Sequence, residues 1–139
     1  MLKSTDLRKG RCCVFLLHVH LVFVTKYRRP VFTQAALVDL RRIFFEVCLD
    51  FEATLVEFEG EKDHVHLLVN YPPKVSVSRL VNSLKGVSSR MIRLKNYESI
   101  RRYLWGNALW SPSYFAGACG GAPLAVIRQY IEQQKAPEN

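Results

Sequence analysis

Apolar and polar residues alternate along residues 64–71, and a period of two predicts a β-strand. Successive side chains of a strand point to opposite faces of its sheet. The apolar residues of one face are Val65, Leu67 and Val69. His64, His66 and Leu68 then share the other face, with the two imidazoles side by side. The apolar face can pack against helices, so the histidine face is expected to stay open.

The same patterns predict the rest of the fold. Further strands are expected over residues 14–25, 53–58 and 109–116. Apolar residues at spacings of three and four predict helices over residues 34–51, 76–94 and 124–135. Thr33 can cap the first helix, Pro112 marks its strand as an edge or a bulge, and Gly86 indicates close backbone packing. The order β-α-β-β-α-β-α predicts an α+β, ferredoxin-like (split βαβ) fold. Its four-stranded antiparallel sheet has two helices on one face, and an extra C-terminal helix follows.

The composition fits a compact protein with a charged partner. A chain of 139 residues is long enough for one core, so residues 1–139 are expected to form a single domain. Twenty Lys and Arg against twelve Asp and Glu give a net charge of +8. That excess favours a polyanionic partner, and nucleic acid is the commonest one. A membrane partner is not expected, because no basic amphipathic helix stands apart from the core.

The four cysteines lack zinc-binding spacing and are expected to be reduced thiols of a cytoplasmic protein. They are Cys12, Cys13, Cys48 and Cys119. The apolar run at residues 12–24 is too short to span a bilayer and lacks a signal-peptide cleavage site.

Basic residues gather in two places beside aromatic ones, which is typical of nucleic-acid binding. One is the turn at residues 26–30, and the other is the second helix with the segment after it. The candidate nucleic-acid contacts are Lys26, Tyr27, Arg28, Arg29, Arg79, Lys85, Arg90 and Arg93. A solvated basic surface is the alternative.

His64 and His66 can bind one divalent cation if a third ligand comes from elsewhere. A structural position on the sheet face is the alternative. His18 and His20 have the same spacing on the first predicted strand, so spacing alone does not choose between the pairs. On the last helix, Tyr130 and Gln134 are four residues apart and share one side.

If the last helix packs over the open sheet face, the amide oxygen of Gln134 could become the third metal ligand. The phenol of Tyr130 would then be a nucleophile beside the metal. An ordinary half-buried aromatic is the alternative for Tyr130.

Six segments of the chain then stand in a familiar order. They are K-Y-R-R-P-V-F (26–32), D-H-V-H-L-L-V (63–69), L-K-G (84–86), L-W-S-P-S-Y-F (109–115), G-G-A-P (120–123) and Y-I-E-Q-Q (130–134). These segments are distributed over nearly the whole chain. In them, the chain resembles the single-tyrosine HUH transposases of the IS200-like family. These small enzymes mobilise insertion sequences with hairpin ends as single-stranded DNA. The resemblance assigns the metal site to His64 and His66 and gives His18 and His20 no catalytic role.

The resemblance implies a DNA transposase that cleaves and rejoins single-stranded DNA without ATP. Tyr130 would attack a phosphodiester and form a 5′-phosphotyrosine link, with His64, His66 and Gln134 binding Mg²⁺ or Mn²⁺. Similar proteins are homodimers with shared active sites, in which the tyrosine helix of one subunit lies against the histidines of the other. Gly117, Gly120 and Gly121 would ease that exchange.

Three other functions are compatible with the residues. The first is a single-stranded nucleic-acid-binding module without catalysis. The second is a domesticated relative that acts on chromosomal repeat hairpins. The third is a metal nuclease that uses water as its nucleophile and leaves no covalent adduct.

Overall fold

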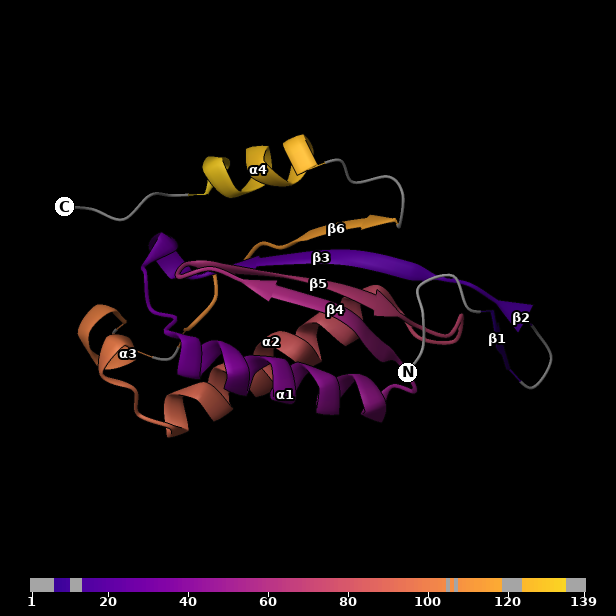
Figure 1. The fold of residues 1–139 in the computed structure, drawn as a ribbon, viewed down its shortest axis with the longest axis horizontal. Coiled ribbons are helices and arrows are strands. Elements are labelled where there is room, and N and C mark those ends of the chain that lie inside the picture. Colours follow the sequence, from indigo (N-terminus) through magenta and orange to yellow (C-terminus); the bar gives the residue numbers. More distant parts are fainter. Residues whose placement is uncertain (1–6, 11–13, 105, 107, 119–123, 135–139) are drawn as a thin grey trace.

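A four-stranded antiparallel sheet forms the middle layer of the protein (Figure 1). The computed structural model describes residues 7–10, 14–104, 106, 108–118 and 124–134. The strands of the sheet are β3 (His18–Val24), β4 (Thr54–Gly60), β5 (His64–Asn70) and β6 (Phe115–Ala118). They lie side by side in the order β4-β5-β3-β6, and every neighbouring pair is antiparallel. The predicted α+β fold with its split βαβ order is confirmed.

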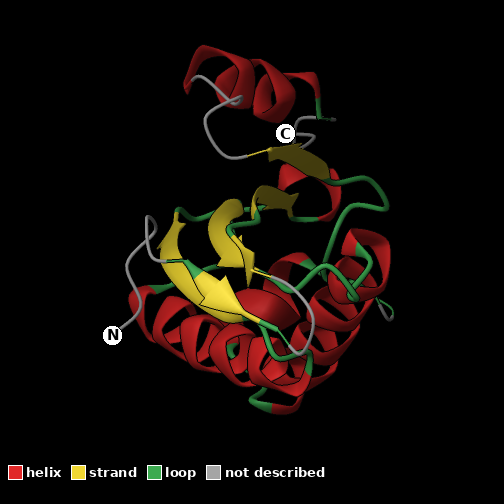
Figure 2. Ribbon diagram, turned by 90° about the vertical axis from the view of Figure 1, so that its right-hand side faces the viewer, coloured by secondary structure: helices red, strands yellow, loops and turns green. Residues whose placement is uncertain are grey.

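Helices cover both faces of this sheet (Figures 1 and 2). The long helices α1 (Gln34–Asp50) and α2 (Val77–Leu94) cover one face. The C-terminal helix α4 (Leu124–Gln133), which carries Tyr130, lies over the other face, so the condition set for a site at His64 and His66 is met. Two shorter elements are the 3₁₀ turn η1 (Lys26–Arg28) and the helix α3 (Glu98–Tyr103).

Local sequence fixes the ends of the long helices. Thr33 accepts a hydrogen bond from the N–H of Ala36 at 3.2 Å and caps α1, as predicted. Ser76 caps α2 in the same way by accepting from the N–H of Arg79 at 3.1 Å. Between these helices and the sheet lies the aromatic part of the core, where Phe23 packs edge-on against Phe44 and Trp110.

Two predicted strands have different limits. The first strand is shorter, because residues 14–15 form a separate strand β2 that pairs with β1 (Arg8–Lys9). The last strand begins at Phe115, whereas residues 109–114 make only a single bridge, between Trp110 and Thr25. Pro112 has no N–H to donate to a ladder, which explains why the segment before it is irregular.

The prediction for Gly86 is wrong. A Cβ atom built at Gly86 meets no atom within 4 Å, so no neighbouring backbone packs there. The close approach is instead at Gly60, where an added Cβ atom would overlap the Leu37 side chain. Cys48 is buried and free, whereas Cys12, Cys13, Cys119, Gly120 and Gly121 lie outside the described residues.

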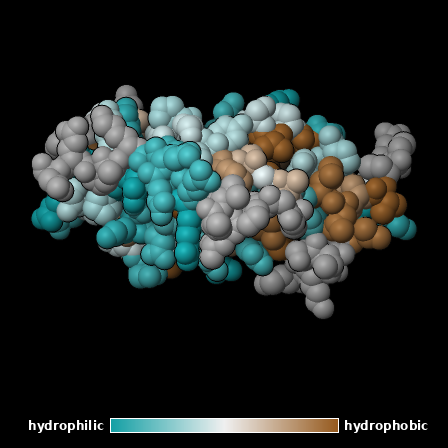
Figure 3. Space-filling view, turned by 90° about the horizontal axis from the view of Figure 1, so that it is seen from above, coloured by the Kyte–Doolittle hydropathy of each residue, from teal (hydrophilic) through white to brown (hydrophobic). Residues whose placement is uncertain are grey.

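Figure 3 looks onto the α4 side of the molecule, where the surface is divided. Hydrophilic side chains gather over its left and central part, and hydrophobic ones gather toward the right end, where β1 and β2 lie in Figure 1. Leu7, Val14 and Leu16 are exposed at these short strands. In the parts of the chain that the structure describes, no helix is long and apolar enough to cross a bilayer.

Candidate active site

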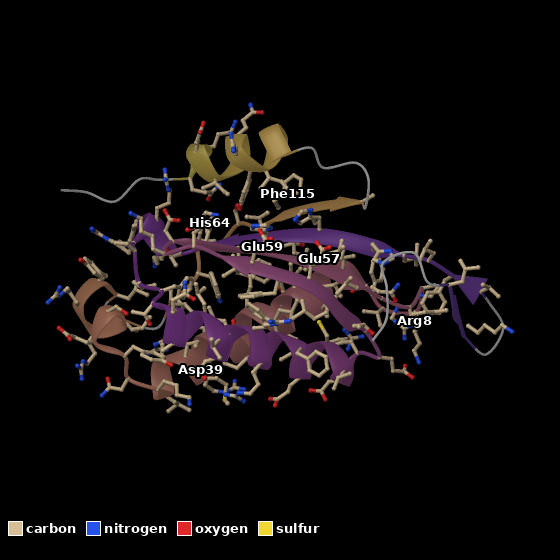
Figure 4. All side chains as sticks on the ribbon, in the orientation of Figure 1. Arg8, Asp39, Glu57, Glu59, His64 and Phe115 are labelled. Atoms are coloured by element: carbon tan, nitrogen blue, oxygen red, sulfur yellow. The ribbon has the colours of Figure 1, made fainter. Side chains whose placement is uncertain are left out.

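His64 and His66 of β5 lie side by side on the sheet face that α4 covers. Figure 4 shows His64 on this face. Strand β5 alternates as its sequence predicts, with Val65, Leu67 and Val69 buried and both histidines half-buried. The two imidazole rings are 6.3 Å apart between centroids and nearly parallel, at 19°. The two imidazoles therefore lie close together on one face, as two ligands of a single cation require.

A carboxylate holds one of these rings. Nδ1 of His64 donates a hydrogen bond to Oδ1 of Asp63 at 2.8 Å. This contact fixes the tautomer of His64 and leaves its Nε2 lone pair open. The hydrogen bond from His64 is also the main cause that lowers the pKa of Asp63, and the nearby Arg28, at 3.5 Å, adds to it.

His66 and His20 are neighbours across two strands. Nε2 of His66 is 3.4 Å from Oε2 of Glu59, and its ring centroid is 5.7 Å from that of His20. Burial lowers the pKa of both imidazoles, although Glu59 opposes that shift. The pair His18–His20, which has the same spacing as His64–His66, thus occupies the same face of the sheet. His18 is buried at its other end, with Nε2 3.4 Å from the Asn70 amide nitrogen.

Tyr130 reaches the same face from α4. Ile127 of that helix is buried against Val22 and Val24, which stand opposite His66 and His64 in the ladder. The ring of Tyr130 lies 5.8 Å from that of Phe115, and its hydroxyl is 2.6 Å from Oγ of Ser113. Burial raises the pKa of Tyr130, while the hydrogen bond with Ser113 acts in the opposite direction.

Gln134 directly follows α4 and lines a small pocket. Its Oε1 accepts a hydrogen bond from Oγ of Ser111 at 3.3 Å, and its Nε2 donates to the carbonyl of Tyr130 at 3.2 Å. The pocket measures about 290 Å³ and is also lined by Lys26 and Tyr27. Thr25 lines it as well and donates its N–H to the carbonyl of Asp63, so the pocket adjoins the histidine strand.

The donor set fits a divalent cation only in part. Among the described residues, no three His, Cys, Asp or Glu side chains are grouped closely enough to hold a metal ion. A site at His64 and His66 therefore needs an oxygen donor such as Gln134, with water or phosphate oxygens completing it.

The structure divides the predicted nucleic-acid contacts into two groups. Lys26, Tyr27, Arg28 and Arg29 lie in or directly after η1, on the active-site side. Tyr27 and Arg28 have positive φ angles of 59° and 53°, which non-glycine residues rarely adopt. The other four residues, Arg79, Lys85, Arg90 and Arg93, belong to α2 on the opposite side of the sheet. The two groups therefore lie on opposite sides of the sheet.

Sequence patterns also missed several residues of the site. Glu59, Ser111 and Ser113 reach it only through strand register and the path of the loop before β6. Local sequence carries no signal for such contacts. The motif D-H-V-H did place Asp63 beside the histidines, but it gave the carboxylate no role.

Comparison with known proteins identifies the class. Residues 13–134 match the family Transposase IS200 like, so the chain belongs to the IS200-like transposases. Members of this family are DNA-cleaving enzymes.

Individual relatives agree with that assignment. The chain is 33% identical over 129 residues to the ISDra2 transposase TnpA of Deinococcus radiodurans, covering 93% of this chain and 91% of that protein. It is 31% identical to the transposase for insertion sequence element IS200 of Salmonella typhimurium, over 83% of this chain and 74% of the relative.

Solved structures share the fold. A crystal structure of a protein assigned as a transposase from Deinococcus radiodurans superposes with a TM-score of 0.83 and 34% identity, over 93% of this chain and 98% of that one. A REP-associated tyrosine transposase bound to a REP hairpin superposes with a TM-score of 0.56 over 91% of this chain and 69% of that one. At 15% identity, this second likeness concerns the fold alone.

Proposed function

We propose that this transposase cleaves and rejoins single-stranded DNA at the hairpin-bearing ends of a mobile element. The phenolic oxygen of Tyr130 attacks the scissile phosphorus, and the bond from phosphorus to the 3′ oxygen breaks. The phenol loses its proton, and the leaving 3′ oxygen gains one. The product is a 5′-phosphotyrosine link, which stores the energy of the broken bond, so a 3′-hydroxyl can rejoin the strand without ATP.

One observation carries this proposal: α4 brings Tyr130 over the sheet face that holds His64 and His66. This position differs from that of an ordinary solvent-exposed tyrosine. The ring is half-buried, its hydroxyl is bonded to Ser113, and the helix beneath it is fixed by Ile127.

We assign His64, His66 and Gln134 as the residues that bind Mg²⁺ or Mn²⁺. The Asp63–His64 hydrogen bond supports this assignment, because metal-binding histidines commonly donate their second nitrogen to a carboxylate. A bound cation would polarise the scissile phosphate and stabilise the departing 3′ oxygen. Without it, burial favours the neutral phenol of Tyr130.

The DNA substrate is inferred from charge and from a relative. Lys26 and Tyr27 line the pocket beside Gln134, where a cation and an exposed ring can contact a phosphate and a base. The fold relative bound to a REP hairpin favours a hairpin as the structured part of the substrate. The same relative supports the alternative that this protein is a domesticated enzyme and that its substrate is a chromosomal repeat hairpin.

A homodimer with shared active sites remains part of the proposal. In the single chain, α4 packs on its own sheet through Ile127, so an arrangement within one subunit is also sterically possible. Mixing Tyr130→Phe subunits with His64→Ala subunits distinguishes the two. Restored cleavage in the mixture requires shared sites, whereas no cleavage means that each subunit uses its own tyrosine.

The proposal is tested with labelled single-stranded DNA that carries candidate hairpin ends, incubated with Mn²⁺ and run on a denaturing gel. We expect a slow, protease-sensitive adduct with the wild-type protein and none with Tyr130→Phe or His66→Ala. Cleavage without an adduct that survives in Tyr130→Phe would indicate a nuclease using water. Binding without cleavage of the element's own ends would indicate a binding module.

A further inference from the structure

Residues 109–113 connect the buried core to the polar residues of α4. Trp110 is only 5% exposed, and its indole N–H donates to Oγ of Ser88 on α2 at 2.9 Å. The backbone on either side is tied to the end of β3. The N–H of Ser111 donates to the carbonyl of Val24 at 2.8 Å, and that of Lys26 donates to Leu109 at 3.0 Å. The first half of this segment is therefore fixed from two sides.

Lys85 fixes the second half. Its ammonium donates to the carbonyl oxygens of Ser111, Pro112 and Ser113 at 2.7, 3.3 and 3.3 Å. An ammonium group has three donors, and hydrogen bonds from a charged donor are stronger than neutral ones. These carbonyls lie outside the ladder of β6, so Lys85 supplies a partner that the sheet does not.

The side chains of the same segment contact α4. Oγ of Ser113 lies 2.6 Å from the hydroxyl of Tyr130, and Oγ of Ser111 donates to Oε1 of Gln134 at 3.3 Å. Tyr130 in α4 and Gln134 directly after it, the two residues that the proposed chemistry uses, are thus held by one loop. Lys85 reaches that loop from the helix layer on the other side of the sheet.

We propose that residues 109–113 form a docking platform for α4, on which Ser113 positions the hydroxyl of Tyr130 and Ser111 positions the amide of Gln134. Lys85 is a positioning residue that holds the platform in shape. This inference rests on the proposed role of Tyr130. It gives Lys85 a task within the protein in place of the phosphate contact that its basic neighbourhood on α2 indicates.

The platform is tested with point variants in three measurements. These are the single-turnover rate of adduct formation with Mn²⁺, the affinity for the same DNA, and hydrogen exchange of the α4 amides without DNA. We expect Ser113→Ala to slow the adduct about fivefold and Lys85→Met about tenfold, from the loss of a neutral and a charged hydrogen-bonding group. Ser113→Thr keeps the hydroxyl and should restore the rate.

The controls match the chemistry of each change. Ser78→Ala removes an exposed hydroxyl from the start of α2, and Lys74→Met removes an exposed ammonium paired with Glu52. Both should leave the adduct rate and the exchange of α4 unchanged. In Lys85→Met, the α4 amides should exchange faster, while those of α1 keep their protection.

Each outcome decides the matter. Wild-type rates in Ser113→Ala and Lys85→Met would overturn the platform, and so would a Ser113→Thr variant as slow as Ser113→Ala. A loss of DNA affinity in Lys85→Met as large as its loss of rate would make Lys85 a DNA contact instead. If the wild type forms no adduct, the proposed function fails. The platform is then tested by hydrogen exchange of the α4 amides alone. Faster exchange of α4 in Lys85→Met then supports it, and unchanged exchange overturns it.

Discussion

Asp63 provides the sharpest test of the proposed metal site. Its carboxylate accepts the hydrogen bond from Nδ1 of His64 at 2.8 Å, and both side chains are largely buried, with 13% and 16% exposed. Removing a carboxylate that orients a metal-binding histidine commonly weakens metal affinity about 10- to 100-fold. That range corresponds to about 1.4 to 2.8 kcal/mol of binding free energy. The loss of Mn²⁺ affinity in Asp63→Ala should therefore fall within this range. The loss in Asp63→Asn, which keeps an acceptor oxygen, should lie near the lower end of the range.

The assay is a titration with Mn²⁺, followed by the loss of the electron paramagnetic resonance signal of the free ion. Asp50→Asn, at the exposed end of α1, is the matched control and should bind like the wild type. Mn²⁺ affinity in Asp63→Ala equal to that of the wild type would refute the reasoning. It would mean either that His64 is not a ligand or that Asp63 does not orient it.

The same carboxylate makes a prediction for the metal-free protein. The hydrogen bond from His64 lowers the folded-state pKa of Asp63, so its stabilising contribution is present above the unfolded value, about 4. That contribution is lost as the pH falls through the lowered pKa. The difference in unfolding free energy between wild type and Asp63→Asn should therefore shrink below about pH 4. A difference that stays constant with pH would contradict the assigned cause.

Three further predictions follow from single residues. Gly86→Ala should raise the free energy of unfolding in urea by about 1 kcal/mol, because the added methyl meets open space on a helix; a loss of stability would show a hidden contact. Burial raises the pKa of Cys48 to about 12, so in a protein with its other cysteines replaced by serine, a thiol reagent at neutral pH should react only after unfolding; rapid labelling of the folded protein would contradict its burial. Lys26→Met should weaken DNA binding and reduce the slope of log affinity against log salt by about one; an unchanged slope would remove Lys26 from the DNA surface.

Elements with a strong period were predictable from the sequence. The alternation around His64 predicts the strand and its buried face, and the spacing of apolar residues predicts α1, α2 and α4. The prediction of one strand over residues 14–25 is too long, because an apolar run does not reveal where its residues change pairing partners. Here the partner changes between β2, which pairs with β1, and β3, which pairs with β5. The helix α3, with six residues, is too short to show a period.

Contacts made through the tertiary structure were not predictable. His20 lies beside His66 because the register pairs His20 with Leu68, which no local pattern encodes. The sequence indicates only that Lys85 is one of several basic residues on its helix. In the structure, its ammonium donates hydrogen bonds to three carbonyl oxygens of residues 111–113. The family motifs named Tyr130 and Gln134, but the loop that holds both of them emerges only from the fold.

The central claim is that Tyr130 becomes covalently joined to DNA. The most direct measurement digests the adduct with protease and nuclease and identifies the modified peptide by mass spectrometry. The account predicts a nucleotide attached through its 5′ phosphate to Tyr130, in the peptide that includes the end of α4. A nucleotide attached to another residue, or cleaved DNA with no modified peptide, would contradict it.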